Sequence, residues 1–327
     1  MGRRRKKGQH ISGWAVVDKP AGMTSTQVVG KMRWTFDAQK AGHAGTLDPL
    51  ATGILPIAFG EATKTIPFIM DAEKVYRFTA KWGEARDTDD AEGHVTETSE
   101  VRPTREEILA ALPGFTGVVS QVPPKYSAIK VDGERAYDLA RAGEDVELKS
   151  REVEIYEFEL VEMADEDHAT FEIECSKGTY VRSLVRDLAQ KLGTFGYVSA
   201  LRRLAVGPFD ESCAHPLDKW IELSHIPPAS EQLMPVETAL DDIPAVAITG
   251  SDATRLRHGQ AVLVRPGTIQ VLGGSELSPG AGADETVFCS HKGEPVAICR
   301  FRQGQLQPAK VFNFSPERGS DVDHART

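Results

Sequence analysis

A carboxylate in a glycine-rich turn is the most chemically informative feature of the sequence. Asp48 lies within residues 42–53 (GHAGTLDPLATG), between two apolar stretches. Pro49 disfavours the helical conformation at Asp48, and the flanking glycines let the backbone approach other groups closely. A carboxylate held in a constrained loop can serve as a nucleophile or as a base. A lone Asp-Pro pair would more often form an Asx turn, in which the side chain bonds its own backbone.

Two further segments carry aromatic and charged side chains at the ends of predicted elements. Residues 75–82 alternate as a strand, and Tyr76 near its start is, on its own, more often a core aromatic than a stacking partner. Tyr180 and Arg182 lie where an alternating strand gives way to a helix predicted over residues 181–192. Side chains at such junctions can reach a cleft, whereas a surface salt bridge is the ordinary alternative for Arg182.

Several local patterns predict the scaffold that must position these groups. Residues 14–17 predict a short buried strand, and Thr24 or Ser25 can cap the helix that follows. Residues 104–107 form a capping-box pattern that opens a scaffold helix. The polar, Pro-rich residues 226–244 predict a boundary, and the short strand-like runs beyond it predict a small β domain.

The composition predicts a globular protein. The 327 residues are 40% hydrophobic and 26% charged, which is enough for one large domain and one small one. There is no signal peptide and no apolar run long enough to cross a bilayer, so we expect a cytoplasmic protein without membrane contact. The four cysteines lack metal-ligand spacing, which predicts reduced thiols and no metal site. Walker and Rossmann signatures are missing as well, so we expect no cofactor.

The charge distribution is uneven. Lys and Arg number 38 against 48 Asp and Glu, a net charge of −10, although a protein that binds a polyanion is usually basic. Binding depends on local patches, however, and residues 3–7 form a basic tail while acids gather at residues 87–92 and 165–167. We expect a basic cleft with the acids on the opposite surface. The basic tail is equally consistent with a solvated terminus and with weak RNA contact.

Together these motifs resemble those of the TruB family of tRNA pseudouridine synthases. Residues 19–25 (KPAGMTS) are similar to the family's first motif, residues 42–53 to its catalytic loop, and residues 121–133 to a segment beside the active site. Residues 178–183 (GTYVRS) match the motif whose Arg pairs with the catalytic Asp. The resemblance covers roughly residues 12–209 and continues more weakly into a C-terminal PUA-like RNA-binding domain.

The resemblance implies an α+β pseudouridine synthase fold with a mixed, largely antiparallel sheet, plus a small C-terminal β-barrel of PUA-like type. The implied division has a basic disordered tail at residues 1–10 and a catalytic domain at 11–240. A PUA-like RNA-binding domain at 241–315 and a disordered tail at 316–327 complete it.

The resemblance also implies roles for individual residues. Asp48 is the expected catalytic carboxylate, Arg182 would keep it ionised and oriented, and Tyr76 would stack on uracil and exchange a proton. Leu201 would line the uracil pocket, and His43 would insert into the RNA loop, although a core or turn histidine is the ordinary alternative. The other expected substrate-binding residues are Tyr180, Lys19, Lys64 and Lys130. For Lys125 and Lys130, phosphate contact and an ordinary surface position remain open.

The implied reaction converts uridine to pseudouridine in the T loop of tRNA, at position 55, without a guide RNA and by a monomeric protein. The reacting base must leave its stack before it can enter a pocket. One alternative is the guide-RNA-dependent archaeal and eukaryotic relative, which residues 121–133 and the bacterial-like C-terminus disfavour. A second is a non-catalytic RNA-binding or RNA-chaperone module on the same fold, which the joint presence of Asp48, Tyr76 and Arg182 disfavours. We expect Asp48, Tyr76, Tyr180, Arg182 and Leu201 to converge on one cleft.

Overall fold

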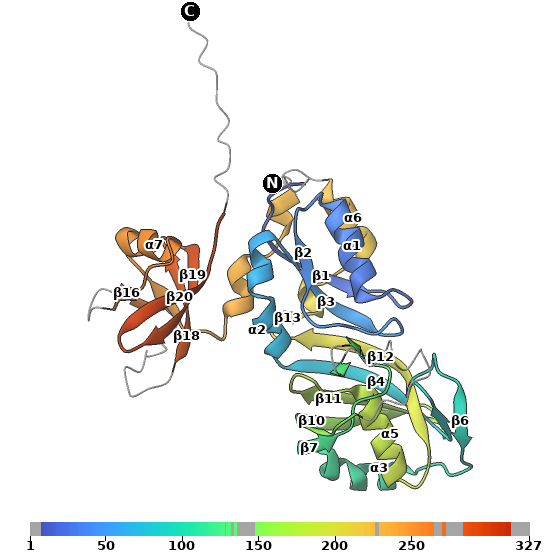
Figure 1. Cartoon of the computed structure of the whole chain (residues 1–327). Coiled ribbons are helices and arrows are strands. Elements are labelled where there is room, and N and C mark those ends of the chain that lie inside the picture. Colours follow the sequence, from blue (N-terminus) through green and yellow to red (C-terminus); the bar gives the residue numbers. More distant parts are fainter. Residues whose placement is uncertain are drawn as a thin grey trace, which may run out of the picture.

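The structure is a computed structural model that describes residues 8–127, 129–131, 134–135, 148–225, 229–264, 270–272 and 284–314. Figure 1 shows a large sheet with helices and, beside it, a smaller C-terminal sheet drawn in orange and red. The helices are α1 (Ser25–Thr35), α2 (Ile66–Asp71), α3 (Arg105–Ala111), α5 (Val181–Lys191), α6 (Leu217–Ser224) and α7 (Gly250–Arg257). The short 3-10 turns are η1 (Gly60–Lys64), η2 (Leu112–Phe115), η3 (Glu211–Cys213), η4 (Ala229–Gln232) and η5 (Val236–Leu240).

The large sheet has ten strands in the order β14-β1-β3-β12-β4-β11-β10-β7, with β2 beside β3 and β13 beside β12. Its strands are β1 (Gly13–Lys19), β2 (Ala41–His43), β3 (Thr52–Phe59), β4 (Lys74–Trp82), β7 (Gly117–Gln121), β10 (Arg151–Met163), β11 (His168–Cys175), β12 (Gly196–Val206), β13 (Phe209–Asp210) and β14 (His215–Pro216). Among the described strand pairs of this large sheet, only β1–β14 and β3–β12 are parallel. The predicted mixed, largely antiparallel sheet is therefore confirmed.

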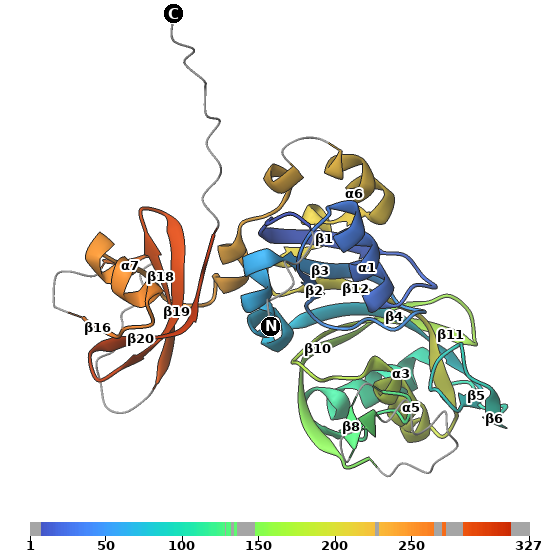
Figure 2. The same cartoon turned by 45° about the horizontal axis from the view of Figure 1, so that its top comes forward.

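Local sequence explains how several elements form. In β4 the apolar residues alternate, so that Phe78 is buried and packs on Phe171 of β11 with ring centroids 5.4 Å apart. Thr24 caps α1 and Thr104 caps α3, each with a reciprocal capping box. The strand predicted over residues 75–82 and the two helix starts are thus confirmed. Figure 2 shows α1 and α6 side by side near β1, with α3 and α5 near β4 and β10.

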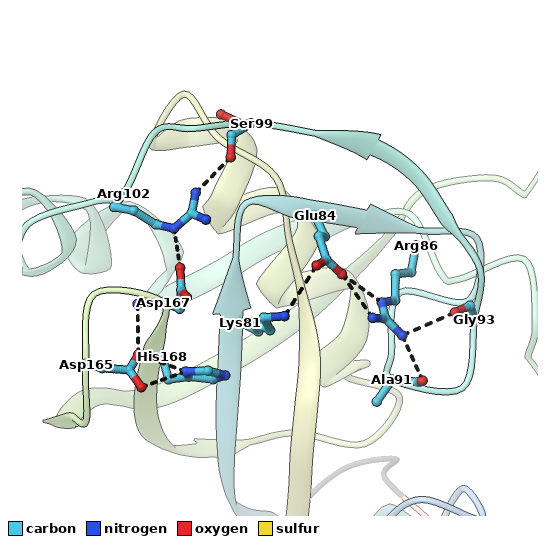
Figure 3. A network of polar contacts seen from close by, with 10 residues as sticks. All are labelled: Lys81, Glu84, Arg86, Ala91, Gly93, Ser99, Arg102, Asp165, Asp167 and His168. Carbon is cyan, nitrogen blue, oxygen red and sulfur yellow. Dashed lines mark hydrogen bonds and ion pairs between the residues drawn. The ribbon is translucent and has the colours of Figure 1, made fainter.

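A network of charged residues holds the hairpin of β5 (Glu84–Arg86) and β6 (Val95–Thr98) against the large sheet (Figure 3). Glu84 pairs with both Lys81 of β4 and Arg86, and Arg86 donates to the carbonyls of Ala91 and Gly93 at 3.0 and 3.3 Å. The Arg86 guanidinium also lies 4.2 Å from the centre of the Tyr197 ring. These contacts fix the turn that contains the acidic residues 87–92.

A second hairpin and the C-terminal sheet complete the described chain. The hairpin pairs β8 (Lys130–Val131) with β9 (Glu134–Arg135). The C-terminal sheet has the order β16-β20-β19-β18-β15-β17 and fits the PUA-like fold. Its strands are β15 (Ala245–Ala247), β16 (Val262–Leu263), β17 (Gln270–Leu272), β18 (Glu285–His291), β19 (Glu294–Arg302) and β20 (Gln305–Val311). None of the described helices has the length and apolar character needed to span a membrane.

The two sheets share a hydrophobic cluster. Phe288 and Phe312 of the C-terminal part pack in one cluster with Trp14, Phe209 and Val236. The expected boundary at residues 226–244 contains η4 and η5, so part of it contributes to this core. Gln9 forms a bridge with Ala38, whereas residues 1–7 and 315–327 lie outside the described residues.

Candidate active site

Asp48 and Arg182 form an ion pair between two segments that are far apart in the sequence. An Arg182 Nη2 atom lies 3.0 Å from Asp48 Oδ2, and the Arg182 side chain is 5% exposed while that of Asp48 is 35% exposed. Arg182 sits in the first turn of α5 and donates further hydrogen bonds to the carbonyls of Thr88 and Tyr126, both at 3.0 Å. The arginine is thereby held in place while the carboxylate keeps some access to solvent.

The pKa of Asp48 is raised, because burial disfavours the charged carboxylate. The Arg182 guanidinium opposes this by favouring the anion, and Asp90 adds to the rise by repulsion. The pKa of Asp48 is thus set by opposing effects of burial and charge, as is common for reactive groups.

The loop that presents Asp48 is tied to the first residue of α1 and to the chain segment before that helix. Ser25 Oγ accepts from the Leu47 amide at 2.9 Å and donates to the Leu47 carbonyl at 3.1 Å. The buried Lys19 ammonium donates to the carbonyls of Pro20, Met23 and Pro49 at 2.9, 2.7 and 3.2 Å. Burial lowers the pKa of Lys19 to about 8. Lys19 thus joins the Asp48 loop to the segment before α1, and its contact with substrate stays a prediction.

Arg203, which the sequence did not single out, lies beneath the loop. It is 1% exposed, and it donates from Nε to the Ile54 carbonyl at 2.7 Å and from Nη2 to the Gly45 carbonyl at 3.2 Å. Its neighbour in register on β4 is Tyr76, and the Arg203 charge opposes the rise that burial causes in the pKa of the Tyr76 phenol. Arg203 therefore links three strands to the Asp48 loop. Charged residues in a strand are ordinarily exposed, so a sequence pattern could not identify it.

Tyr76 and Leu201 flank this arrangement on adjacent strands. Tyr76 is 9% exposed, and burial raises the pKa of its phenol, with the Asp48 carboxylate close enough to add to the rise. Leu201 is on β12, in register with Phe78 of β4, and it is partly buried against the main hydrophobic core. The Thr52 hydroxyl at the start of β3 donates to the Leu201 carbonyl at 3.5 Å. Asp48, Tyr76 and Arg203 thus belong to one locality, and Leu201 is on the same strand as Arg203.

Asp90 is a second residue that the sequence did not single out. Its Oδ2 atom lies 3.6 Å from Arg182 Nη1, and its Oδ1 accepts from the Thr88 hydroxyl at 2.6 Å and the Glu92 amide at 3.0 Å. Asp89 pairs with Arg186 at 2.9 Å, one helical turn after Arg182. The expectation that the acidic residues 87–92 lie away from the site is therefore wrong, because two of them pair with arginines of α5.

His43 lies near Arg203, and Tyr180 directly precedes the helix that carries Arg182. His43 is on β2, and its pKa is lowered by burial and then by the nearby Arg203. Its buried Nδ1 has no hydrogen-bond partner among the described residues. Tyr180 is the N-cap residue of α5, and the Gln121 side chain bonds both its amide and its carbonyl, at 2.8 and 3.1 Å. Arg151 lies 4.9 Å from the centre of the Tyr180 ring.

The other two predicted lysines have different positions. The Lys64 ammonium pairs with Glu61 at 2.5 Å and donates to the Val311 carbonyl of the C-terminal sheet at 2.7 Å. Lys64 therefore joins the two sheets, and a contact with substrate remains a prediction. The backbone of Lys130 is described in β8, but its side chain lies outside what the structure describes.

A hollow of about 230 Å³ lies next to Arg186, and its lining residues are Asp87, Asp89, Val122, Pro123, Lys125, Leu148 and Arg186. It is one helical turn along α5 from Arg182, so it borders the ion pair without containing it. Among the described residues there is no group of three or more His, Cys, Asp or Glu side chains arranged to hold a metal ion.

Comparison with solved structures defines the class of protein. The chain is 25% identical to a chain in a crystal structure of a Cbf5-Nop10-Gar1 complex, with a TM-score of 0.70 over 92% of this chain and 85% of that one. A structure of an H/ACA RNP bound to a substrate RNA containing 2'-deoxyuridine gives a TM-score of 0.71 at 22% identity, covering 97% and 92% of the two chains. The fold is that of the pseudouridine synthases.

Sequence comparison narrows this class. Residues 33–181 match the TruB family pseudouridylate synthase (N terminal domain), and residues 182–241 match the tRNA pseudouridylate synthase B C-terminal domain. Relatives named tRNA pseudouridine synthase B are 55% identical in Caulobacter vibrioides, over 95% of this chain and 99% of the relative, and 54% identical in Bradyrhizobium diazoefficiens, over 95% and 88%. The chain belongs to the TruB family of pseudouridine synthase enzymes.

Proposed function

We propose that this enzyme isomerises uridine to pseudouridine at position 55 in the T loop of tRNA, without a guide RNA. The observation that carries the proposal is the pairing of Asp48 with the buried Arg182 at 3.0 Å, beside Tyr76. The relatives of 54 and 55% identity are named for tRNA, which supports this substrate. The similarity to the Cbf5 and H/ACA structures is only 22–25%, which favours action without their partners.

The isomerisation breaks the bond between C1′ and N1, turns the detached uracil and forms a bond from C1′ to C5. C5 loses a proton and N1 takes one up, so the overall composition is unchanged. Attack by a carboxylate on the ring, attack on the sugar and assistance to elimination all require an ionised group close to C1′ and C6. Asp48 fits this requirement, because the Arg182 guanidinium favours the ionised carboxylate and so opposes the rise in pKa that burial causes. Arg182 also restricts the carboxylate to one orientation.

Tyr76 and Leu201 are suited to hold the base. The Tyr76 ring can stack on uracil, since an aromatic face binds any base without hydrogen bonds that would resist its rotation. Its raised pKa keeps the phenol neutral at physiological pH, so it can donate a hydrogen bond or relay a proton. Leu201 would close the pocket from β12 and exclude water. Arg203, its neighbour in register on β12, would position the Tyr76 hydroxyl during this exchange.

Access to a base in a folded loop requires that it be turned out of its stack. His43 is close enough to the Asp48 loop to fill the resulting gap, since it precedes that loop directly and lies at the end of β2. Burial keeps its imidazole neutral, which suits insertion among bases. The C-terminal sheet would bind another part of the same RNA, and a single copy of the chain would suffice for catalysis.

The decisive experiment is to add the purified chain alone to unmodified tRNA and to measure pseudouridine by primer extension after chemical labelling. Formation at position 55 supports the proposal, and a tRNA with cytidine at that position is the matched control. Activity that appears only after a guide RNA is added would support the guide-dependent alternative. Binding without any pseudouridine would indicate a non-catalytic RNA-binding module.

A further inference from the structure

Trp34 is an exposed aromatic residue on a helix that already has a buried face. It is 81% exposed, whereas the other three tryptophans of the chain, Trp14, Trp82 and Trp220, are 0 to 2% exposed. Helix α1 packs through Val28 and Met32, and Trp34 lies two residues beyond Met32, roughly 200° around the helix. The packing of α1 therefore does not require this side chain.

Lys31 and Arg33 are neighbours of Trp34 along α1, and Lys40 follows the helix in the sequence. Lys31, Arg33 and Lys40 are all exposed, and none of them forms an ion pair with a described residue. Arg33 donates from Nε to the Ala38 carbonyl at 3.2 Å, which fixes its side chain at the end of the helix. Asp37 is the one acid between residues 31 and 40. We call the surface of α1 that carries Lys31, Arg33 and Trp34 the tryptophan patch.

The first described residues of the chain lie near the end of α1. Gln9 forms a bridge with Ala38, and Gln39 Nε2 donates to the Gly8 carbonyl at 2.8 Å. Gly8 is therefore anchored just beyond the end of α1. In the sequence, five consecutive cations, residues 3–7, come immediately before Gly8. In a chain with a net charge of −10, the sequence thus places five cations immediately before Gly8 and two more beside Trp34 on α1.

We infer that the tryptophan patch binds the RNA substrate: an unpaired base other than the reacting uridine stacks on Trp34, and the phosphates beside it contact the patch cations. Proteins that bind unpaired nucleic acid combine an aromatic ring, on which a base stacks, with nearby cations that contact the phosphates. The patch is within reach of an RNA in the active site, because Ser25 at the other end of α1 bonds Leu47 and Trp34 is about 14 Å further along the helix. This inference rests on the proposed function.

Fluorescence quenching tests the inference directly, since Trp34 is the exposed tryptophan of the four. Acrylamide should quench Trp34 in the free protein, and saturation with full-length tRNA should protect it. Trp34→Ala should weaken tRNA affinity about tenfold, and Trp34→Phe should restore most of it, because the ring that stacks is retained. Deletion of residues 2–7 should make the affinity less dependent on salt.

The matched control is Val118→Ala, which removes an apolar side chain that is 65% exposed on β7, the opposite edge strand of the sheet. This variant should bind tRNA as the unmodified chain does. The inference is overturned if Trp34 stays open to acrylamide in the tRNA complex and Trp34→Ala binds normally while the chain still forms pseudouridine. It is also overturned if Trp34 becomes protected as protein concentration rises without RNA, because a second copy would then cover it. Absence of pseudouridine with the unmodified chain would instead count against the proposed function.

Discussion

The Asp48 carboxylate lies 3.0 Å from a guanidinium nitrogen of Arg182, and the arginine of this pair is almost entirely buried. Arg182 is held by two backbone carbonyls and faces a second carboxylate, Asp90, at 3.6 Å. One cation is therefore shared between two anions of unequal access to solvent. The charges of Arg182 and Asp90 both affect the pKa of Asp48, and the contact with Arg182 orients the Asp48 carboxylate.

Asp48→Asn should reduce pseudouridine formation by more than about 10³-fold while leaving tRNA affinity nearly unchanged. The amide keeps the shape of the side chain but is a far poorer nucleophile and base. Affinity comes from phosphate contacts and stacking over a wide surface. Single-turnover assays and filter binding measure the two effects. Near-normal turnover by the Asn variant would remove Asp48 from the catalytic role.

The same substitution should not lower stability at neutral pH. Because the folded-state pKa of Asp48 is raised, its favourable contribution is present below the unfolded pKa and is lost as pH rises through the folded pKa. The Asn variant stays neutral and does not undergo this loss. Thermal melts at several pH values should therefore show that the stability of the Asn variant, relative to that of the unmodified chain, increases as pH rises. A variant that becomes relatively less stable at higher pH would contradict this sign.

As pH is lowered, the activity should be lost when Asp48 takes up a proton, because the reaction requires the ionised carboxylate. Since the pKa of Asp48 is raised, this acidic limb of the pH profile should lie at a higher pH than for an ordinary aspartate. Asp90→Asn should move this limb to lower pH, since the Asp90 charge contributes to the rise. Glu172→Gln is a suitable control, because Glu172 pairs with Arg77 on an exposed face of the sheet. The measurement is kcat/KM against pH, and an unmoved limb in Asp90→Asn would argue against the electrostatic coupling.

Gly53→Ala should destabilise the fold by more than about 3 kcal/mol. Gly53 has a φ of +97°, and an added Cβ would lie 2.1 Å from the Arg203 carbonyl oxygen, where the backbone cannot easily move. Gly22→Ala is the matched control, because its φ is +81° and nothing lies within 4 Å of the added Cβ. Gly22→Ala should cost about 1 kcal/mol, the strain of the left-handed backbone alone. Urea unfolding compares the two, and equal costs would show that the close contact relaxes.

Lys64 and Lys310 should act together in joining the two sheets. Lys64 donates to the Val311 carbonyl, and Lys310 donates to the Lys64 carbonyl, both at 2.7 Å. Each change to Met should lower stability by about 1 kcal/mol, and the double variant should lose less than the sum, because the two bonds depend on the same alignment. Chemical unfolding provides the measurement, with Lys219→Met, which removes an exposed pair with Glu222, as control. Strict additivity would mean that the two bonds are independent.

Local order along the chain was sufficient to predict much of the scaffold. The alternation of β4 and the capping boxes at Thr24 and Thr104 depend on residues a few positions apart, so the sequence itself determines them. The Asp48 turn and the junction before Arg182 are also local patterns. Their pairing at 3.0 Å was expected from the family resemblance, and the structure supplied its geometry.

Only the tertiary structure shows which groups are in contact with Arg203, Asp90, Lys19 and Lys64. Arg203 is separated from Ile54 by 149 residues and Lys64 from Val311 by 247, and no local pattern connects such distant positions. A charged side chain has the same appearance in a sequence whether it is solvated or buried. Only the packing of β3, β4 and β12 removes water from Arg203 and gives it backbone carbonyls as partners. The physical reason is that desolvation is a property of the assembled fold and of no single segment.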